Sequence, residues 1–275
     1  MFDCCEDYTS VYLFMEYCEG GDLLTRLKDK GCFNERVSAR IIRQLAEAVQ
    51  ECHKKGIMHR DVKPENVLLT DNSESPGVKL TDFGLSTFFS PGQKFLGERH
   101  MVGTTLYAAP EVLKQLYSEE ADVWSCGVTL YVMLCGRLPF NGDTEDEIFQ
   151  AVLVGHLDLQ SAPWHTIPET AKEVVEGLLN RAPKHRITLG EFLTHQWIIP
   201  AGGLSIFQKL KEMSDDKSFS QRYRRFSSSV SNSFRRTVAH SFDGGSRPLV
   251  QAPTKFSSPA GSTQRSHTVV ARVSG

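Results

Sequence analysis

The feature that most constrains the fold is a helical spacing of apolar residues that ends near Ile199. The clearest example lies over residues 34–55, where apolar side chains fall on one stripe and Gly56 follows the last turn. Residues 119–135 are apolar nearly all round in their second half, which predicts a buried helix. The sequence therefore predicts a helix-rich core within residues 1–198.

Short apolar runs predict a few strands beside these helices. Residues 11–16 read as a strand that Gly20 and Gly21 follow, and residues 22–30 read as a short helix. Two further strands are expected at 67–69 and 78–80, on either side of a polar turn. Capping-box patterns that start at Thr144 and Thr188 predict two later helices. We therefore expect an α+β fold that is mainly helical.

From residue 199 onward the composition changes to Ser, Arg, Gly and Pro with few aliphatic residues. Such a segment buries too little apolar surface to offset the entropy lost on ordering. We therefore expect two parts, a folded domain over residues 1–198 and a disordered tail over residues 199–275.

The composition of the chain limits the kinds of partner and compartment that we expect for it. The net charge of the 275 residues is −2, so no general basic field favours nucleic acid as a partner. The seven cysteines show neither a CxxC pair nor zinc spacing, and scattered thiols of this kind are typical of a cytoplasmic or nuclear protein. The first ten residues lack the pattern of a secretory signal, and no apolar stretch is long enough to span a membrane.

Three motifs carry the chemistry. The sequence IMHRDVKPEN occupies residues 57–66, Asp-Phe-Gly follows at 82–84, and Ala-Pro-Glu at 109–111. In this order they resemble the signatures of eukaryotic serine/threonine protein kinases, whose catalytic loop reads HRDxxxxN. The resemblance runs from about residue 2 to residue 198, and it includes residues 122–127 and Arg186. It implies a protein kinase-like fold with a mainly helical C-terminal lobe.

The resemblance also assigns roles to the motif residues. Asp61 would accept the proton of a Ser or Thr hydroxyl, and Lys63 would place a positive charge beside the transferred phosphate. Asn66 and Asp82 would supply oxygen ligands to Mg²⁺, which prefers such donors. ATP and Mg²⁺ are therefore the expected cofactors, with protein Ser/Thr residues as acceptors.

Residues 14–22 resemble the hinge that binds the adenine of ATP. On this basis the carbonyl of Glu16 and the amide of Cys18 would bind the adenine edge, and Asp22 would reach the ribose. Glu65 is placed in the same nucleotide-binding set. A second interpretation of Asp22 and Glu65 is that they face basic residues upstream of the acceptor in a substrate peptide.

Two positions favour serine/threonine over tyrosine specificity. Lys63, two residues after Asp61, is typical of serine/threonine kinases, and Thr104 resembles the threonine of their substrate-positioning loop. The alternative for Thr104 is that it only caps a turn.

At closer range, the segment over residues 82–95 resembles plant calcium-dependent protein kinases and the related phosphoenolpyruvate carboxylase kinase-related kinases. No EF-hand loop pattern follows the domain, so we expect no calcium-binding EF-hand in this chain.

The kinase resemblance is incomplete at its start. Only the residues before Phe14 precede the hinge, and they contain neither the Gly-rich loop nor the lysine-bearing strand of the family. Three interpretations stay open: part of an active kinase, a non-catalytic kinase-like scaffold or competitor, and a weakly active short form. The intact Asp61, Asn66 and Asp82 favour the first of these.

Overall fold

The computed structural model describes residues 3–6, 10–90, 95–96, 105–114, 116–199 and 268–274. The chain divides into two compact units. One comprises Met1–Tyr17 with Phe207–Gly275, and the other comprises Cys18–Ile206.

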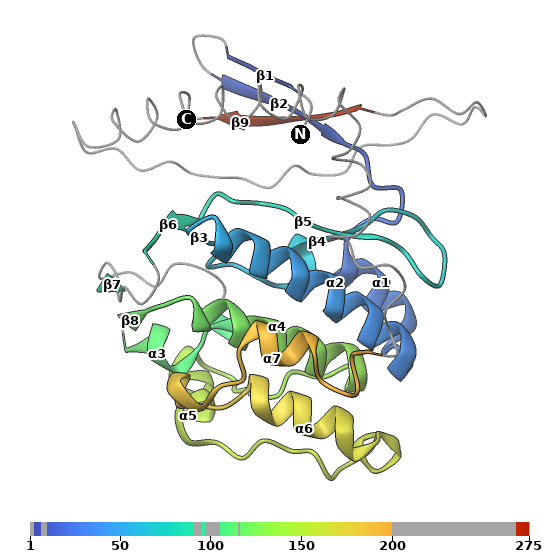
Figure 1. Ribbon diagram of the computed structural model, residues 1–275, viewed down its shortest axis with the longest axis vertical. Coiled ribbons are helices and arrows are strands. Elements are labelled where there is room, and N and C mark those ends of the chain that lie inside the picture. Colours follow the sequence, from blue (N-terminus) through green and yellow to red (C-terminus); the bar gives the residue numbers. More distant parts are fainter. Residues whose placement is uncertain are drawn as a thin grey trace. The chain divides into compact units, whose positions relative to one another are not determined.

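The first unit contains a three-stranded antiparallel sheet in the order β1-β2-β9 (Figure 1). Strand β1 is Asp3–Glu6, β2 is Ser10–Glu16 and β9 is Thr268–Ser274. Strand β9 lies within residues 199–275, the segment that we expect to be a tail. The sequence TVVARVS contains three valines, and β-branched residues favour strands. Residues 200–267 lie outside the described part of the chain.

The second unit is mainly helical, as expected. Seven α-helices occur among its described residues, and they are α1 Leu23–Lys30, α2 Glu35–Lys54, α3 Pro110–Leu113, α4 Glu120–Cys135, α5 Glu145–Val154, α6 Glu169–Leu178 and α7 Leu189–Leu193. Four 3₁₀ turns accompany them, and they are η1 Pro64–Asn66, η2 Thr105–Tyr107, η3 Trp164–Thr166 and η4 Pro183–His185.

Three two-stranded ribbons complete this unit. They pair β3 Ile57–Met58 with β6 Thr87–Phe88, β4 Val67–Leu69 with β5 Val78–Leu80, and β7 Phe95–Leu96 with β8 Leu116–Tyr117. The strands expected at 67–69 and 78–80 are confirmed as β4 and β5.

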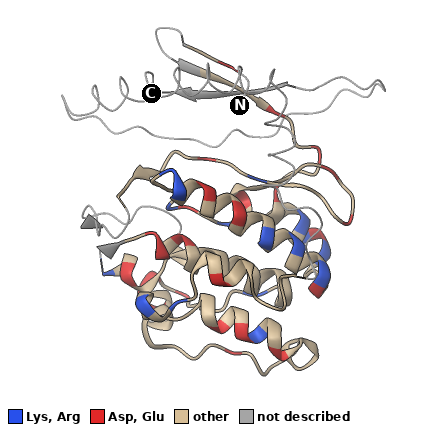
Figure 2. Cartoon of the chain, viewed as in Figure 1, with Lys and Arg blue, Asp and Glu red and all other residues tan. Residues whose placement is uncertain are grey.

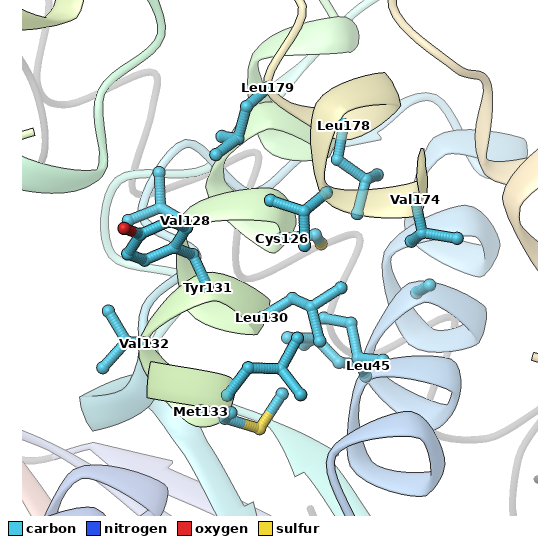
Figure 3. Packing of buried hydrophobic residues seen from close by; sticks show 14 of the residues in the cluster. Leu45, Cys126, Val128, Leu130, Tyr131, Val132, Met133, Val174, Leu178 and Leu179 are labelled. Carbon is cyan, nitrogen blue, oxygen red and sulfur yellow. The ribbon is translucent and has the colours of Figure 1, made fainter. Parts of the chain in front are cut away.

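The core lies where α4 packs between α2 and α6 (Figure 3). Leu45 of α2, Leu130 of α4 and Leu178 of α6 are all fully buried. A Cβ on Gly127 would stand 2.8 Å from the Cβ of Leu178, so the glycine is what lets α4 and α6 approach this closely. Consistent with this central position, α4 carries only two charged side chains (Figure 2). The expected buried helix is confirmed.

The expected helix starts are also found, with one difference in detail. At α7 the Thr188 and Glu191 side chains form a full capping box. At α5 the Thr144 hydroxyl accepts the Glu147 amide, but the Glu147 carboxylate accepts the amide of Asp143, one residue earlier than in a capping box. No helix among the described residues is long and apolar enough to cross a membrane.

A buried ion pair joins distant parts of the helical unit. The Glu111 carboxylate accepts two hydrogen bonds from the Arg186 guanidinium, at 2.5 and 2.9 Å, and the two side chains are 9% and 0% exposed. Arg186 also donates to the carbonyls of Glu120 and Asn180 and stacks on Trp124. Removing Glu111 leaves the charge of Arg186 buried without an ionic partner.

We therefore predict that Glu111→Ala lowers the free energy of unfolding by about 3–5 kcal/mol. Urea denaturation of the chain measures this change. The control is Glu51→Gln, which breaks the solvent-accessible pairs with Lys54 and Lys55 and costs less than about 1 kcal/mol. Equal losses in the two variants would contradict this account of the buried pair.

Candidate active site

The position of the site depends on Asp122, a carboxylate that α4 buries to 2% exposure. Its Oδ1 accepts the backbone amide of Arg60 and its Oδ2 accepts that of His59, both at 2.9 Å. Oδ2 also lies 2.8 Å from Nε2 of His53 on α2. Arg60 has φ of 66°, a conformation that costs a non-glycine residue free energy. The motif loop comprises residues 59–66, and Asp122 holds its first two residues in a strained but defined conformation.

These contacts set the ionisation of Asp122. Burial alone raises the pKa of a carboxyl group, because it disfavours the charged form. Other interactions outweigh that effect: a hydrogen bond with His53, the charge of His53, and the backbone amides of His59 and Arg60. The pKa of Asp122 therefore lies below its ordinary value. The ionised carboxylate is thus the form that the fold stabilises.

The loop then brings three predicted residues together. Nζ of Lys63 lies 2.7 Å from Oδ2 of Asp61. Nδ2 of Asn66 donates to the same oxygen at 3.0 Å and to the Asp61 carbonyl at 2.8 Å. Asp61 is 8% exposed, so its carboxylate is fixed by two side chains in a nearly enclosed position. The η1 turn, which starts at Pro64, is what returns Asn66 to Asp61.

The second motif is joined to this cluster through the backbone. Strand β4 pairs with β5, and beyond the last pair the amide of Thr81 donates to the carbonyl of Asn66 at 2.9 Å. The carbonyl of Thr81 lies 3.0 Å from Nε2 of His59. Asp82 therefore follows directly on a residue that is hydrogen-bonded to both ends of the motif loop.

Asp82 itself has φ of 61°, and its Oδ1 accepts the amide of Gly84 at 3.2 Å. Its carboxylate is exposed, whereas the ring of Phe83 packs edge-on against His59 at 4.8 Å. Nε of Arg60 donates to the carbonyl of Leu85 at 2.5 Å. Both sides of Asp82 are thus tied to the loop, and its side chain remains accessible.

The oxygen atoms of Asn66 and Asp82 suit a hard cation that takes its other ligands from water and a bound molecule. No group of three or more His, Cys, Asp or Glu side chains among the described residues could hold a metal ion. Asn66 uses its amide nitrogen on Asp61, which leaves its carbonyl oxygen for coordination, and Asp82 offers an exposed carboxylate. Mg²⁺ commonly takes only one or two protein oxygens together with water and substrate phosphates. These residues therefore fit Mg²⁺ bound with a nucleotide.

Of the other predicted residues, Glu65 lies within η1 next to Asn66, and the rest lie outside the motif loop. Glu16 ends β2 in the first unit and is exposed, while Cys18 begins the second unit and is buried. Asp22 is the N-cap of α1, where Oδ1 accepts the amide of Thr25 at 2.7 Å and Oδ2 accepts its hydroxyl at 2.8 Å. Glu65 is exposed within η1. Thr104 lies outside the described residues, so its role stays a prediction.

Sequence reasoning missed the part that Asp122 plays. The motif around it was assigned to a buried helix, but the contact with the amides of His59 and Arg60 was not foreseen. A signal was present, because a carboxylate in an almost wholly apolar helix must find hydrogen-bond donors.

The lowered pKa of Asp122 gives a pH-dependent prediction. Its contribution to stability is present above the unfolded pKa, near 4, and is lost as the pH falls through the lower folded pKa. We expect Asp122→Asn to lower Tm strongly at pH 7, and the gap from the wild type to narrow below about pH 4. Thermal unfolding measures both.

The control is Asp143→Asn, an exposed position that should leave Tm unchanged at either pH. A gap between wild type and Asp122→Asn that stays constant from pH 7 to pH 3 would exclude the ionised carboxylate as the source of the stability.

Comparison with known proteins shows the family of the chain. The protein kinase domain model matches residues 1–198. Calcium-dependent protein kinase 15 of Oryza sativa subsp. japonica is 50% identical over 193 residues, which are 70% of this chain and 35% of that protein. Calcium-dependent protein kinase SK5 of Glycine max is 47% identical over 194 residues, or 70% of this chain and 38% of that protein.

A further relative, calcium-dependent protein kinase 3 of Oryza sativa subsp. japonica, is 42% identical over 231 residues, which are 81% of this chain and 41% of that protein. The chain thus spans between 35% and 41% of the length of these curated relatives. The family match covers most of the chain and includes all three motifs and their supports. On these grounds the chain belongs to the protein kinase domain family.

Proposed function

We propose that the site takes part in transfer of the γ-phosphate of ATP to the hydroxyl of a protein Ser or Thr. One observation carries this proposal: the carboxylate of Asp61 is held between Nζ of Lys63 and Nδ2 of Asn66. A fixed carboxylate beside a fixed positive charge suits a reaction in which catalysis consists mainly of positioning and charge stabilisation.

Each side chain then has a defined task. Asp61 orients the acceptor hydroxyl and takes its proton. Lys63 keeps its ammonium group next to that carboxylate, where it can also meet the negative charge of a phosphate. Asn66 and Asp82 would hold Mg²⁺, which neutralises phosphate charge when it is bound.

The adenine would be bound by the carbonyl of Glu16 and the amide of Cys18. For Asp22, a role at the ribose would require its carboxylate to be shared, because both oxygens already accept hydrogen bonds from Thr25. We further infer a cytoplasmic or nuclear protein whose sequence carries no EF-hand loop pattern over residues 1–275.

The proposal predicts a loss of phosphorylation on Asp61→Asn. An amide in place of the carboxylate cannot accept the proton, so we expect kcat to fall by about 10²–10⁴. A peptide phosphorylation assay with Mg-ATP measures this, and Asp29→Asn on the exposed side of α1 is the matched control.

Two results would contradict the proposal. One is an Asp61→Asn variant as active as Asp29→Asn. The other is a wild-type chain that neither phosphorylates peptides nor gains Tm with rising Mg-ATP, since binding to the native state must raise Tm. The second result would favour a non-catalytic kinase-like scaffold or competitor.

The exposed carboxylate of Glu65 supports a preference for basic peptides. It lies within the motif loop, directly before Asn66, and its charge contributes to the raised pKa of nearby Tyr107, an effect secondary to burial. Opposite charge in a groove favours substrates with Arg or Lys before the acceptor. We expect Glu65→Gln to reduce the preference for basic residues in a peptide array more than Glu74→Gln, an exposed control in the β4–β5 turn. A wild-type profile without any basic preference would rule this out.

A further inference from the structure

Helix α2 holds the turn between β4 and β5, residues 70–77, along one of its faces. Nε2 of Gln44 donates to the carbonyl of Pro76 at 3.1 Å, and Oε1 of Gln44 accepts the amide of Val78 at 3.2 Å. One helical turn earlier, Nη1 of Arg40 donates to Oγ of Ser75. The β4–β5 turn is therefore held by two side chains that are four residues apart and share a face of α2.

The same face of α2 carries a second positive charge. Arg36 lies four residues before Arg40, is exposed, and makes no hydrogen bond or ion pair with another described residue. Val37 and Glu74 line one cavity, so the start of α2 lies beside the turn. Figure 2 shows Lys and Arg side chains on α1 and on the first turns of α2. A negatively charged group attached to Oγ of Ser75 would therefore meet two guanidinium groups.

We propose that Ser75 is a phosphorylation site, and that Arg40 and Arg36 bind the phosphate. The neutral hydroxyl uses one hydrogen bond of the Arg40 guanidinium, whereas a phosphate offers several charged acceptor oxygens and can be bound at two of them. Ser75 is exposed and lies beyond the pair of Leu69 with Val78, which is the last of the β4–β5 ladder. Its hydroxyl is therefore accessible without unpairing of the strands.

The residue after the serine indicates the class of modifying enzyme. Pro76 has a fixed φ and no amide hydrogen, and protein kinases that act on Ser-Pro select this feature. Ser-Pro also occurs at 90–91 and 258–259, but residues 91 and 258–259 lie outside the described part of the chain. In the transfer from ATP, Oγ of Ser75 forms a bond to the γ-phosphorus and the bond from that phosphorus to ADP breaks. The hydroxyl proton passes to the base of the modifying kinase.

Two features of the turn oppose the modification. Pro76 is buried, so the turn has to leave α2 while a kinase acts on it. Segments outside a strand ladder open locally at a lower free energy than the whole fold. Glu74 also places a like charge next to the phosphate, but exposed charges interact weakly in water. The direct contact with Arg40 is therefore the stronger interaction.

A phosphate bound in this way ties the turn more firmly to α2. The hairpin of β4 and β5 has Asn66 directly before its first strand and Asp82 two residues after its second. Phosphorylation at the turn therefore stiffens the element that positions both of these residues. Only a consequence for the binding of Mg²⁺ or a nucleotide rests on the proposed function.

Thermal unfolding of the full chain with phosphoserine encoded at position 75 tests the role of the arginines. We expect Tm to rise by about 2–4 °C above that of the chain with serine, because charge-assisted hydrogen bonds are added. The rise should disappear in Arg40→Gln and be smaller in Arg36→Gln. The control is Lys54→Gln, which removes an exposed cation at the other end of α2 and should leave the rise unchanged.

Mass spectrometry tests whether Ser75 is modified in the folded chain. The full Asp61→Asn chain is incubated with Mg-ATP and a protein kinase selective for Ser-Pro, and phosphate should appear on Ser75. The Asp61→Asn background excludes phosphorylation by the chain itself under the proposed function. The peptide DNSESPGVK, residues 71–79, shows that the kinase accepts the sequence outside the fold.

Two outcomes overturn the proposal. The first is a chain with phosphoserine at position 75 whose Tm does not rise, or rises equally with and without Arg40→Gln. That result would leave the arginines without a part in binding the phosphate. The second is a peptide that the kinase modifies while Ser75 of the folded chain stays unmodified. That result would show a turn that is closed to the enzyme.

Discussion

The buried carboxylate of Asp122 is the interaction on which the rest of the site depends. It is fixed inside α4, and its oxygens accept the amides of His59 and Arg60 at the start of the motif loop. A buried charge is tolerated only when donors surround it, so the loop and the helix core must be correct together. The packing of α4 against α2 and α6 is thereby transmitted to the position of the reactive side chains.

The other residues of the site are positioned by a few contacts that follow from Asp122. The loop returns through η1, so that Lys63 and Asn66 meet the carboxylate of Asp61. The backbone contact between Asn66 and Thr81 then places Asp82 beside the same loop. Under the proposed function, these elements supply a proton acceptor, a positive charge and two oxygen donors from a small part of the sequence, and positioning of this kind is what phosphoryl transfer requires.

Sequence reasoning predicted most of the helices, because their apolar spacing and caps are local signals. Asn34 before α2 and Thr188 before α7 are examples of such caps. It also selected Asp61, Lys63 and Asn66, which the structure brings together. Long-range pairing was not visible to it: residues 268–274 belong to a segment that is polar and tail-like in overall composition, yet they pair with β2. The sequence also did not show that both carboxylate oxygens of Asp22 cap α1, because side-chain hydrogen bonds are not visible in residue spacing alone.

We propose that Asn66 and Asp82 hold one divalent cation together with a nucleotide. Electron paramagnetic resonance of Mn²⁺, used in place of Mg²⁺, measures this directly in a titration of the chain with ATP present. We predict that the wild type and Asp61→Asn bind Mn²⁺ only with ATP, and that Asn66→Ala and Asp82→Asn each bind it far more weakly. Binding that is equal in the wild type and in both of these variants would contradict it.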